Sequence, residues 1–354
     1  MIYTLFNILF LQLLLIVFLF RYSNDNILWL LVPLLALPLV INDIVFPSNY
    51  MPDQFKYLAV AQRLRGSAEF IQFFNSPVEF AGLFFAFSPI PVINSIFDLA
   101  VFNRFAISLF IIFASYYFRI RRKYLALLIL FPSGLLYSSL ALRDTLICLI
   151  MSVSFLFLIH KRFLGSAIIL APLAILKLQN FLVMATYFCL RAVSCSFTGR
   201  RHSVIVVAYF LCFFVSLLMV SDEVDRIRRA LFLEDGGDVD EYVAISSALT
   251  LAQHLAISPI KFLLEPTVVQ ATNFFQLIQS VENIAVIAVL FLLFRKAFSV
   301  DREVSLQILA FLLAGLALYG LVVFNFGTGV RYKFPFIFTV LIGLICVIEA
   351  RRSE

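Results

Sequence analysis

Long apolar segments follow one another along almost the whole chain, separated by short polar stretches. They fall at residues 2–20, 27–44, 80–97, 101–118, 124–142, 145–159, 163–176, 180–190, 204–220, 283–294, 304–324 and 334–348. A helix that spans a bilayer needs about 20 apolar residues, and most segments approach that length. Of the 354 residues, 63% are hydrophobic and 14% are charged, against about 25% charged in soluble domains. The sequence therefore predicts an all-α polytopic membrane protein, with residues 1–354 forming one membrane domain.

The distribution of lysine and arginine predicts the orientation, because cytoplasmic loops carry an excess of both. Basic clusters occur at 119–123, 160–162, 191–201, 295–296 and 351–352. All of them fall on one side if the intervening segments each cross once, so this side is expected to be the cytoplasm. The basic pI of about 9.1 follows from these loops and does not call for nucleic acid as a partner.

The segment 80–97 decides between two topologies. It contains Pro89 and Pro91, which remove helix hydrogen bonds and favour a re-entrant or interfacial element. The re-entrant interpretation gives eleven crossings with the N-terminus outside. A spanning helix gives twelve crossings with both ends inside.

Two regions between the apolar segments are expected to be extramembrane loops, 45–79 and 221–282, both on the periplasmic side. In the second, Asp238 and Glu241 resemble a capping box that begins a helix, and Pro259 is expected to end it. The side chains at helical spacing divide into two stripes. The predicted apolar stripe is Ile245, Leu249, Ala252 and Ala256, and the predicted polar stripe is Asp240, Ser247, Thr250, His254 and Ser258. We expect an amphipathic helix at the membrane surface.

Cations occupy three short turns on the less basic outer side. Arg143 precedes Asp144 between two apolar segments, Lys177 lies in the next hairpin, and Arg331 and Lys333 lie before the last segment. A charge deep in a bilayer costs about 2.5–3.5 kcal/mol, so it usually faces a cavity or a partner. Any one of them also fits a side chain that snorkels to the headgroups. Because the positive-inside rule disfavours all three turns, we interpret them as one composite anion site, with arginine suited to phosphate.

Several short motifs resemble those of the O-antigen polymerases of the Wzy type and of related bacterial lipid-linked glycan polymerases. The motifs are SLALRDTL, KLQN and GVRYKFPF, together with an acidic residue four positions before a tyrosine, Asp53 and Tyr57 in PDQFKY. The whole-chain architecture, with phenylalanine-rich helices and a large late periplasmic loop, is also similar to that family.

The resemblance implies a GT-C-like, metal-independent glycosyltransferase without a cofactor, in the bacterial inner membrane with its active site facing the periplasm. Such enzymes transfer a glycan from undecaprenyl pyrophosphate to another lipid-linked repeat unit. Membrane lipids, a chain-length regulator and a flippase are further expected partners.

This reaction needs cations for the departing pyrophosphate and a base for the attacking hydroxyl. Arg143 and Arg331 are the predicted catalytic cations. The predicted substrate-binding cations are Lys177, Lys333, Arg226, Arg228 and Arg229. His254 is the predicted base, since His160 and His202 fall in cytoplasmic loops; Asp53 and Glu265 are alternatives, and Tyr57 is a further substrate contact.

Other functions stay open at this point. They are a GT-C enzyme that uses a polyprenyl-phosphate sugar, a lipid-linked oligosaccharide flippase or transporter, and a purely structural membrane protein. Paired acids in the first outer loop would favour the first, and internal repeats with midplane charges would favour the second. The sequence shows neither.

Overall fold

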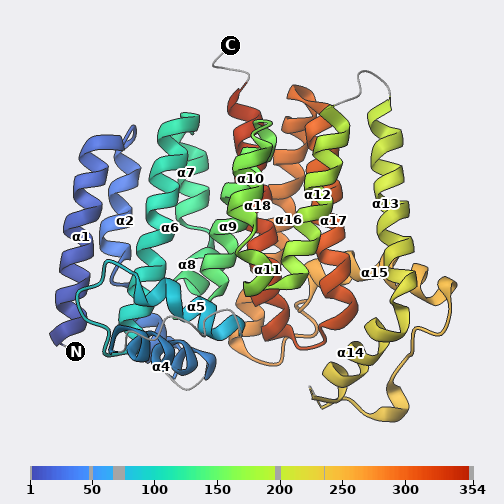
Figure 1. The fold of residues 1–354 in the computed structure, drawn as a ribbon, viewed down its shortest axis with the longest axis horizontal. Helices are drawn as coiled ribbons and strands as arrows, with labels where there is room; N and C mark the ends of the chain where they lie inside the picture. Colours follow the sequence, from blue (N-terminus) through green and yellow to red (C-terminus); the bar gives the residue numbers. More distant parts are fainter. Residues whose placement is uncertain (1, 48–50, 67–75, 196–200, 235, 351–354) are drawn as a thin grey trace. The chain divides into compact units, whose positions relative to one another are not determined.

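The computed structural model describes residues 2–47, 51–66, 76–195, 201–234 and 236–350, and the side chains of 201–203 are not part of that description. All the regular structure in these ranges is helical (Figure 1). The all-α prediction is therefore confirmed for the described residues. The chain divides into two compact units, one formed by residues 1–153, 168–181 and 349–354, the other by 154–167 and 182–348.

The longest helices are α1 (Ile2–Tyr22), α6 (Ile96–Phe118), α12 (Leu178–Cys195), α13 (Arg201–Met219), α16 (Phe274–Val300), α17 (Arg302–Val322) and α18 (Phe326–Ala350). Helices of intermediate length are α4 (Asp53–Gly66), α5 (Pro77–Ala86), α9 (Asp144–Ile159), α14 (Ser221–Glu234) and α15 (Ala248–Leu264). Short helical pieces are η1 (Asn26–Leu30), α2 (Leu31–Leu34), α3 (Leu37–Leu39), η2 (Val40–Val45), α7 (Arg122–Ile129), α8 (Pro132–Ser138), α10 (Phe163–Leu170), α11 (Leu173–Leu176) and η4 (Val239–Glu241).

By length and composition, seven helical segments among the described residues can cross a membrane. The number is eight if the bent pair Val204–Met219 and Ser221–Glu234 counts as one span. Four shorter apolar helical segments of 10–17 residues accompany them. These features agree with a multi-pass membrane protein, and the predicted count of eleven or twelve crossings stays a prediction.

The segment 80–97 does not form one continuous helix. It contains the end of α5, a non-helical stretch with Pro89 and Pro91, and the start of α6. Arg65 of α4 donates hydrogen bonds to the carbonyl oxygens of Ala86 (2.9 Å), Ser88 (2.8 Å) and Ile90 (2.6 Å) in this stretch. Backbone groups that the prolines leave without helical partners are thus satisfied by a side chain. A ten-residue helix extends only about 15 Å, so α5 is too short to span a bilayer.

The first unit is organised around α6, whose side chains are mostly buried and which packs against α1. Ser95 and Asp98 form a capping box at its N-terminus. Asn7 of α1 donates a 2.9 Å hydrogen bond to the buried Asp98 carboxylate, which pins the two helices together. The predicted continuous segment 124–142 is broken into α7 and α8, because Pro132 begins a new helix.

In the second unit, α15 packs closely against α17. Gly320 of α17 makes this possible, because a Cβ there would lie 2.6 Å from the carbonyl oxygen of Ser258. The rings of Phe262 and Tyr319 stack at 6.4 Å between centroids. The predicted helix is therefore packed on a candidate membrane span, and its position at the membrane surface stays a prediction.

The local predictions for this helix need correction as well. Asp238 caps η4 by accepting from Asp240, while α15 begins at Ala248 with Ser247 and Thr250 as its capping box. Pro259 lies inside the helix, which continues to Leu264. The predicted apolar stripe fails because Leu249 is 69% exposed and Leu251 is fully buried.

Two of the predicted basic clusters, 191–201 and 351–352, lie partly or wholly outside the described residues. Residues 48–50 and 67–75 of the predicted loop 45–79 also lie outside them.

Candidate functional site

Arg143 lies at the end of a non-helical segment between α8 and α9, in the first unit. Leu140, Ala141 and Leu142 before it are buried, although they belong to no helix. The side chain of Arg143 is half-buried, and its Nε is shielded from solvent with no hydrogen-bond partner among the described residues. Buried polar groups are rarely left unsatisfied, and the residue as a whole keeps accessible surface, so Arg143 is a candidate contact for a ligand.

Lys177 interrupts the helical path in the same unit. It has an extended backbone between α11 and α12 and is half-buried. Asn180 of the same KLQN motif is buried and donates to the sulfur of Met151 at 3.0 Å. The motif thus combines a half-buried cation with a residue that fixes α12 to α9.

Asp53 and Tyr57 lie one turn apart on α4, also in the first unit. Asp53 forms a 3.0 Å ion pair with Lys56. Tyr57 is 2% exposed and packs against Phe85, with 6.1 Å between ring centroids. Tyr57 therefore packs α4 against α5, and this packing role does not require a bound ligand.

Arg331 does not lie in a turn, as the sequence predicted, but on α18, which already begins at Phe326. The side chain of Asn325 accepts from the amide nitrogens of Gly327 (2.8 Å) and Thr328 (3.4 Å) and so caps this helix. Arg331 is half-buried in the second turn of α18.

Lys333 faces the protein interior instead of a surface. It is 3% exposed, and its ammonium donates to Asn283 Oδ1 (2.7 Å) and to the carbonyl oxygen of Glu265 (3.0 Å). The carbonyl oxygens of Phe262 and Leu263, both at 3.5 Å, complete the surroundings. These carbonyls are at the C-terminal end of α15, where a cation is favourable. The predicted phosphate contact is therefore corrected: Lys333 joins α18 to α15 and α16.

Arg228 is also a packing residue. It is 7% exposed, donates to the carbonyl oxygen of Val243, and lies over the rings of Tyr242 (5.2 Å) and Phe324 (5.4 Å). Asp225, one turn earlier on α14, accepts from the Tyr242 hydroxyl (2.8 Å) and from the Ile245 amide nitrogen (2.7 Å). Together they attach α14 to the segment that leads into α15. Burial and the neighbouring Asp225 raise the pKa of Tyr242 to about 12.

The two other predicted arginines of α14 are exposed. Arg226 forms a 2.6 Å ion pair with Glu223 on the same helix. Arg229 lies next to the buried Arg228. Of the three, Arg226 and Arg229 have the accessibility that a ligand requires.

His254 is half-exposed on α15, on the side of the helix near Arg228 and Asp225. Burial lowers the pKa of this imidazole, the positive charges of Arg228 and Lys261 act in the same direction, and Asp225 opposes them. The neutral form, which accepts a proton, is thus favoured at neutral pH.

Glu265 ends α15 and offers a second candidate base. Its carboxylate accepts from Gln270 at 3.3 Å and lies 3.8 Å from the ammonium of Lys261. The Glu265 carboxylate is thus already engaged by two neighbouring side chains. We therefore keep His254 as the predicted base and Glu265 as the alternative.

The predicted site residues fall into both compact units. Arg143, Lys177, Asp53 and Tyr57 belong to the first, and His254, Glu265, Arg331, Lys333 and the α14 arginines belong to the second. A composite site therefore requires contributions from both units, and it stays a prediction.

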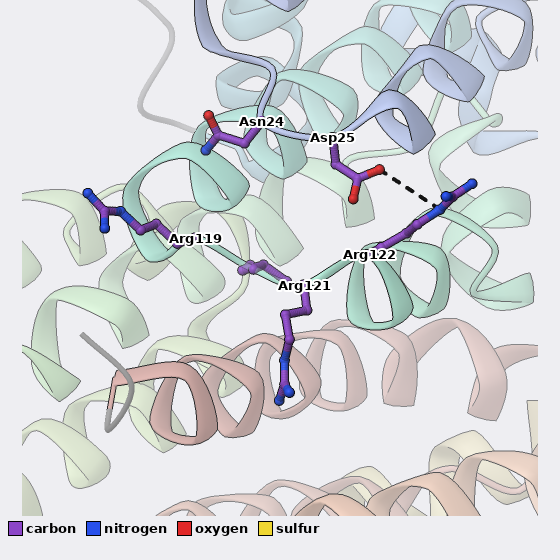
Figure 2. Close-up of a pocket in the computed structure, with 6 residues that line it drawn as sticks. Asn24, Asp25, Arg119, Arg121 and Arg122 are labelled. Carbon is purple, nitrogen blue, oxygen red and sulfur yellow. Dashed lines mark ion pairs between the residues drawn. The ribbon is translucent and has the colours of Figure 1, made fainter. Parts of the chain in front are cut away.

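A basic hollow of about 400 Å³ in the first unit is a different feature. It is lined by Asn24, Asp25, Arg119, Ile120, Arg121 and Arg122. Figure 2 shows that the three arginines point away from one another. Arg121 forms an ion pair with Glu349 at 2.8 Å, and Arg122 lies 4.0 Å from Asp25. The hollow is formed by the basic cluster 119–123, which is predicted to be cytoplasmic. Its three arginine side chains do not converge on one ligand position.

Several buried polar residues were missed at the sequence level. They are Asn42, Gln54, Asn103, Arg104 and Asn283. Arg104 is 2% exposed inside α6, and its Nε and Nη2 have no hydrogen-bond partner in the part of the chain that the structure describes. An arginine and an asparagine within the apolar segment 101–118 are the signal that points to them.

Among the described residues, no group of three or more His, Cys, Asp or Glu side chains lies close enough to hold a metal ion. Comparisons with protein-family models, with curated proteins and with solved structures find no match for this chain. The resemblance to glycan polymerases therefore stays a hypothesis based on motifs and architecture.

Proposed function

We propose that this chain is a metal-independent, GT-C-like glycosyltransferase that polymerises undecaprenyl-pyrophosphate-linked repeat units into an O-antigen or a related surface polysaccharide. The proposal places it in the bacterial inner membrane with eleven or twelve crossings and a site that faces the periplasm. The observation that carries it is the half-buried Arg143, whose shielded Nε has no partner among the described residues. In an apolar multi-pass protein, such a cation fits a lipid-linked anion.

In the proposed reaction, the acceptor hydroxyl attacks the anomeric carbon of the donor glycan. A new glycosidic carbon–oxygen bond forms, the bond from the same carbon to the phosphate oxygen breaks, and the electron pair leaves with undecaprenyl pyrophosphate. His254 takes the hydroxyl proton, for which its lowered pKa keeps it neutral. Arg143 and Arg331 stabilise the growing charge on the leaving pyrophosphate. Lys177 and Arg229 are further contacts of the anion.

The first test is the chain length of the polysaccharide made by cells that carry Arg143→Ala or Arg331→Ala. Loss of one group that stabilises an oxyanion typically lowers the rate about 10²–10³-fold. We expect long chains to disappear while single lipid-linked repeats remain. The matched control is Arg63→Ala, an exposed arginine that pairs with Glu79 at 3.0 Å, and it is expected to leave the chain length unchanged. Normal chain length in both site variants contradicts the proposal.

The second test concerns convergence. If Arg143 and Arg331 hold one diphosphate, cysteines at the two positions react with one short bifunctional thiol reagent when the native cysteines are replaced by serine. A link in the intact protein supports a composite site. Single labelling at both positions without a link contradicts it.

A further inference from the structure

The segment 139–142, which leads to Arg143, is buried without being helical. Ser138 ends α8, and Asp144 begins α9. Leu140 is 3% exposed, and Ala141 and Leu142 are fully buried. Backbone amides and carbonyls in such a place need partners, because a buried group without a hydrogen bond loses the bonds that it would make with water.

Side chains from three other elements supply these partners, one residue after another. Asn103 of α6 donates from Nδ2 to the carbonyl oxygens of Leu140 (2.7 Å) and Leu142 (2.8 Å). The amide nitrogen of Ala141 donates to Gln54 Oε1 of α4 at 2.7 Å.

The segment is also held at its start. Asn42 of η2 donates to the carbonyl oxygen of Ser139 at 2.7 Å, and Arg104 of α6 donates to the Ser138 hydroxyl at 2.9 Å. Each residue from Ser138 to Leu142 therefore forms a hydrogen bond with a side chain of η2, α4 or α6.

All four partners are themselves buried: Asn42 is 1% exposed, Gln54 1%, Asn103 0% and Arg104 2%. Burying four polar side chains is costly unless their hydrogen bonds are formed. A loop that only connects two helices does not need this arrangement, since a helix of apolar residues would bury the same surface without it. The arrangement fixes the backbone on which Arg143 is carried.

We propose that Asn42, Gln54 and Asn103 are positioning residues for Arg143. They hold the buried segment so that the guanidinium meets the pyrophosphate in one orientation. This inference rests on the proposed function for its catalytic consequence. Its structural part, that the three amides fix the segment, is measurable without any activity.

The chemistry of the bonds allows a matched test with two amides. Gln54 acts as an acceptor, so Gln54→Glu keeps an oxygen for the Ala141 amide, whereas Gln54→Leu removes it. Asn103 acts as a donor, so Asn103→Asp places a carboxylate against two carbonyl oxygens. The same change from amide to carboxylate is thus expected to be tolerated at position 54 and to be damaging at position 103.

The structural measurement is hydrogen exchange of a peptide that covers 139–143 in the purified full-length protein. Loss of a hydrogen bond that contributes about 1–2 kcal/mol raises the open population about 5- to 30-fold. We expect exchange to accelerate by this factor in Gln54→Leu and Asn103→Asp, and Gln54→Glu to restore slow exchange. A peptide around Ser247 at the start of α15 is the control for global unfolding and is expected not to change.

The functional measurement is the chain length of the polysaccharide in the same variants. We expect Gln54→Leu and Asn103→Asp to shorten it and Gln54→Glu to restore it relative to Gln54→Leu. Unchanged exchange at 139–143 in both damaging variants overturns the positioning role, whatever the enzyme does. If exchange accelerates but the chain length is normal, the three amides do fix the segment, and their proposed role in the reaction is contradicted. If Arg143→Ala and Arg331→Ala also leave the chain length normal, the proposed function fails as well.

Discussion

Replacement of Lys333 by methionine distinguishes a structural lysine from a phosphate ligand. Its ammonium makes a 2.7 Å hydrogen bond to Asn283 and a 3.0 Å hydrogen bond to the carbonyl oxygen of Glu265. Methionine fills a similar volume and makes neither bond. The change leaves a buried amide oxygen and the C-terminal carbonyls of α15 without a cation.

The expected cost follows from these two bonds. A buried group that loses its partner costs about 1–3 kcal/mol, so the two together cost about 2–6 kcal/mol of unfolding free energy. At roughly 2 °C for each kcal/mol in a chain larger than about 150 residues, the melting temperature falls by about 4–12 °C.

The assay is thermal unfolding of the purified protein in detergent. Lys261→Met is the matched control, because Lys261 is an exposed lysine on α15 whose ammonium lies 3.8 Å from Glu265. Such an exposed pair contributes about 0–1 kcal/mol, so little change is expected. The double variant Lys333→Met with Asn283→Leu is expected to cost less than the sum of its single variants. An unchanged melting temperature in Lys333→Met, together with lost polymerisation, refutes the structural role and restores Lys333 as a ligand.

Three further predictions concern single residues. Burial and Arg228 lower the pKa of His254. Polymerase activity is therefore expected to fall only when the pH drops below the ordinary histidine pKa of about 6.5. Half-maximal activity above that pH contradicts His254 as the base. Gly320→Ala forces α15 away from α17 and is expected to destabilise the protein by about 1–3 kcal/mol, whereas Gly66→Ala, with open space around it, leaves the melting temperature unchanged. Arg104→Met removes a buried charge whose Nε and Nη2 have no partner among the described residues and is expected to preserve stability or raise it by up to about 4 kcal/mol; a clearly lower melting temperature contradicts this.

The helices themselves could be predicted from the sequence, because apolar composition alone decides which segments leave water. Apolar segments such as 101–118 and 304–324 correspond to α6 and α17. The breaks could not be predicted as well. Pro132 divides a segment that hydropathy presents as continuous, and Pro259 is accommodated inside α15 although a proline usually ends a helix.

The candidate site was predictable only as a set of residue types. Cations in short segments predicted to lie on the outer side led to Arg143 and Arg331 as candidates, although Arg331 lies on α18. The sequence does not tell a buried lysine that caps a helix from one that faces a ligand. Lys333 is held in the interior by a hydrogen bond to Asn283, which is 50 residues away in the chain. Likewise, Gln54 and Asn42 reach the segment before Arg143 from 87 and 97 residues away. Contacts over such distances leave no local pattern.

The most direct measurement is an assay with the purified protein in lipid vesicles and undecaprenyl-pyrophosphate-linked repeat units as the only substrate. We predict a ladder of longer lipid-linked glycans with release of undecaprenyl pyrophosphate, and no ladder with Arg143→Ala. Intact single repeats after incubation with the folded wild-type protein would contradict the proposed polymerase.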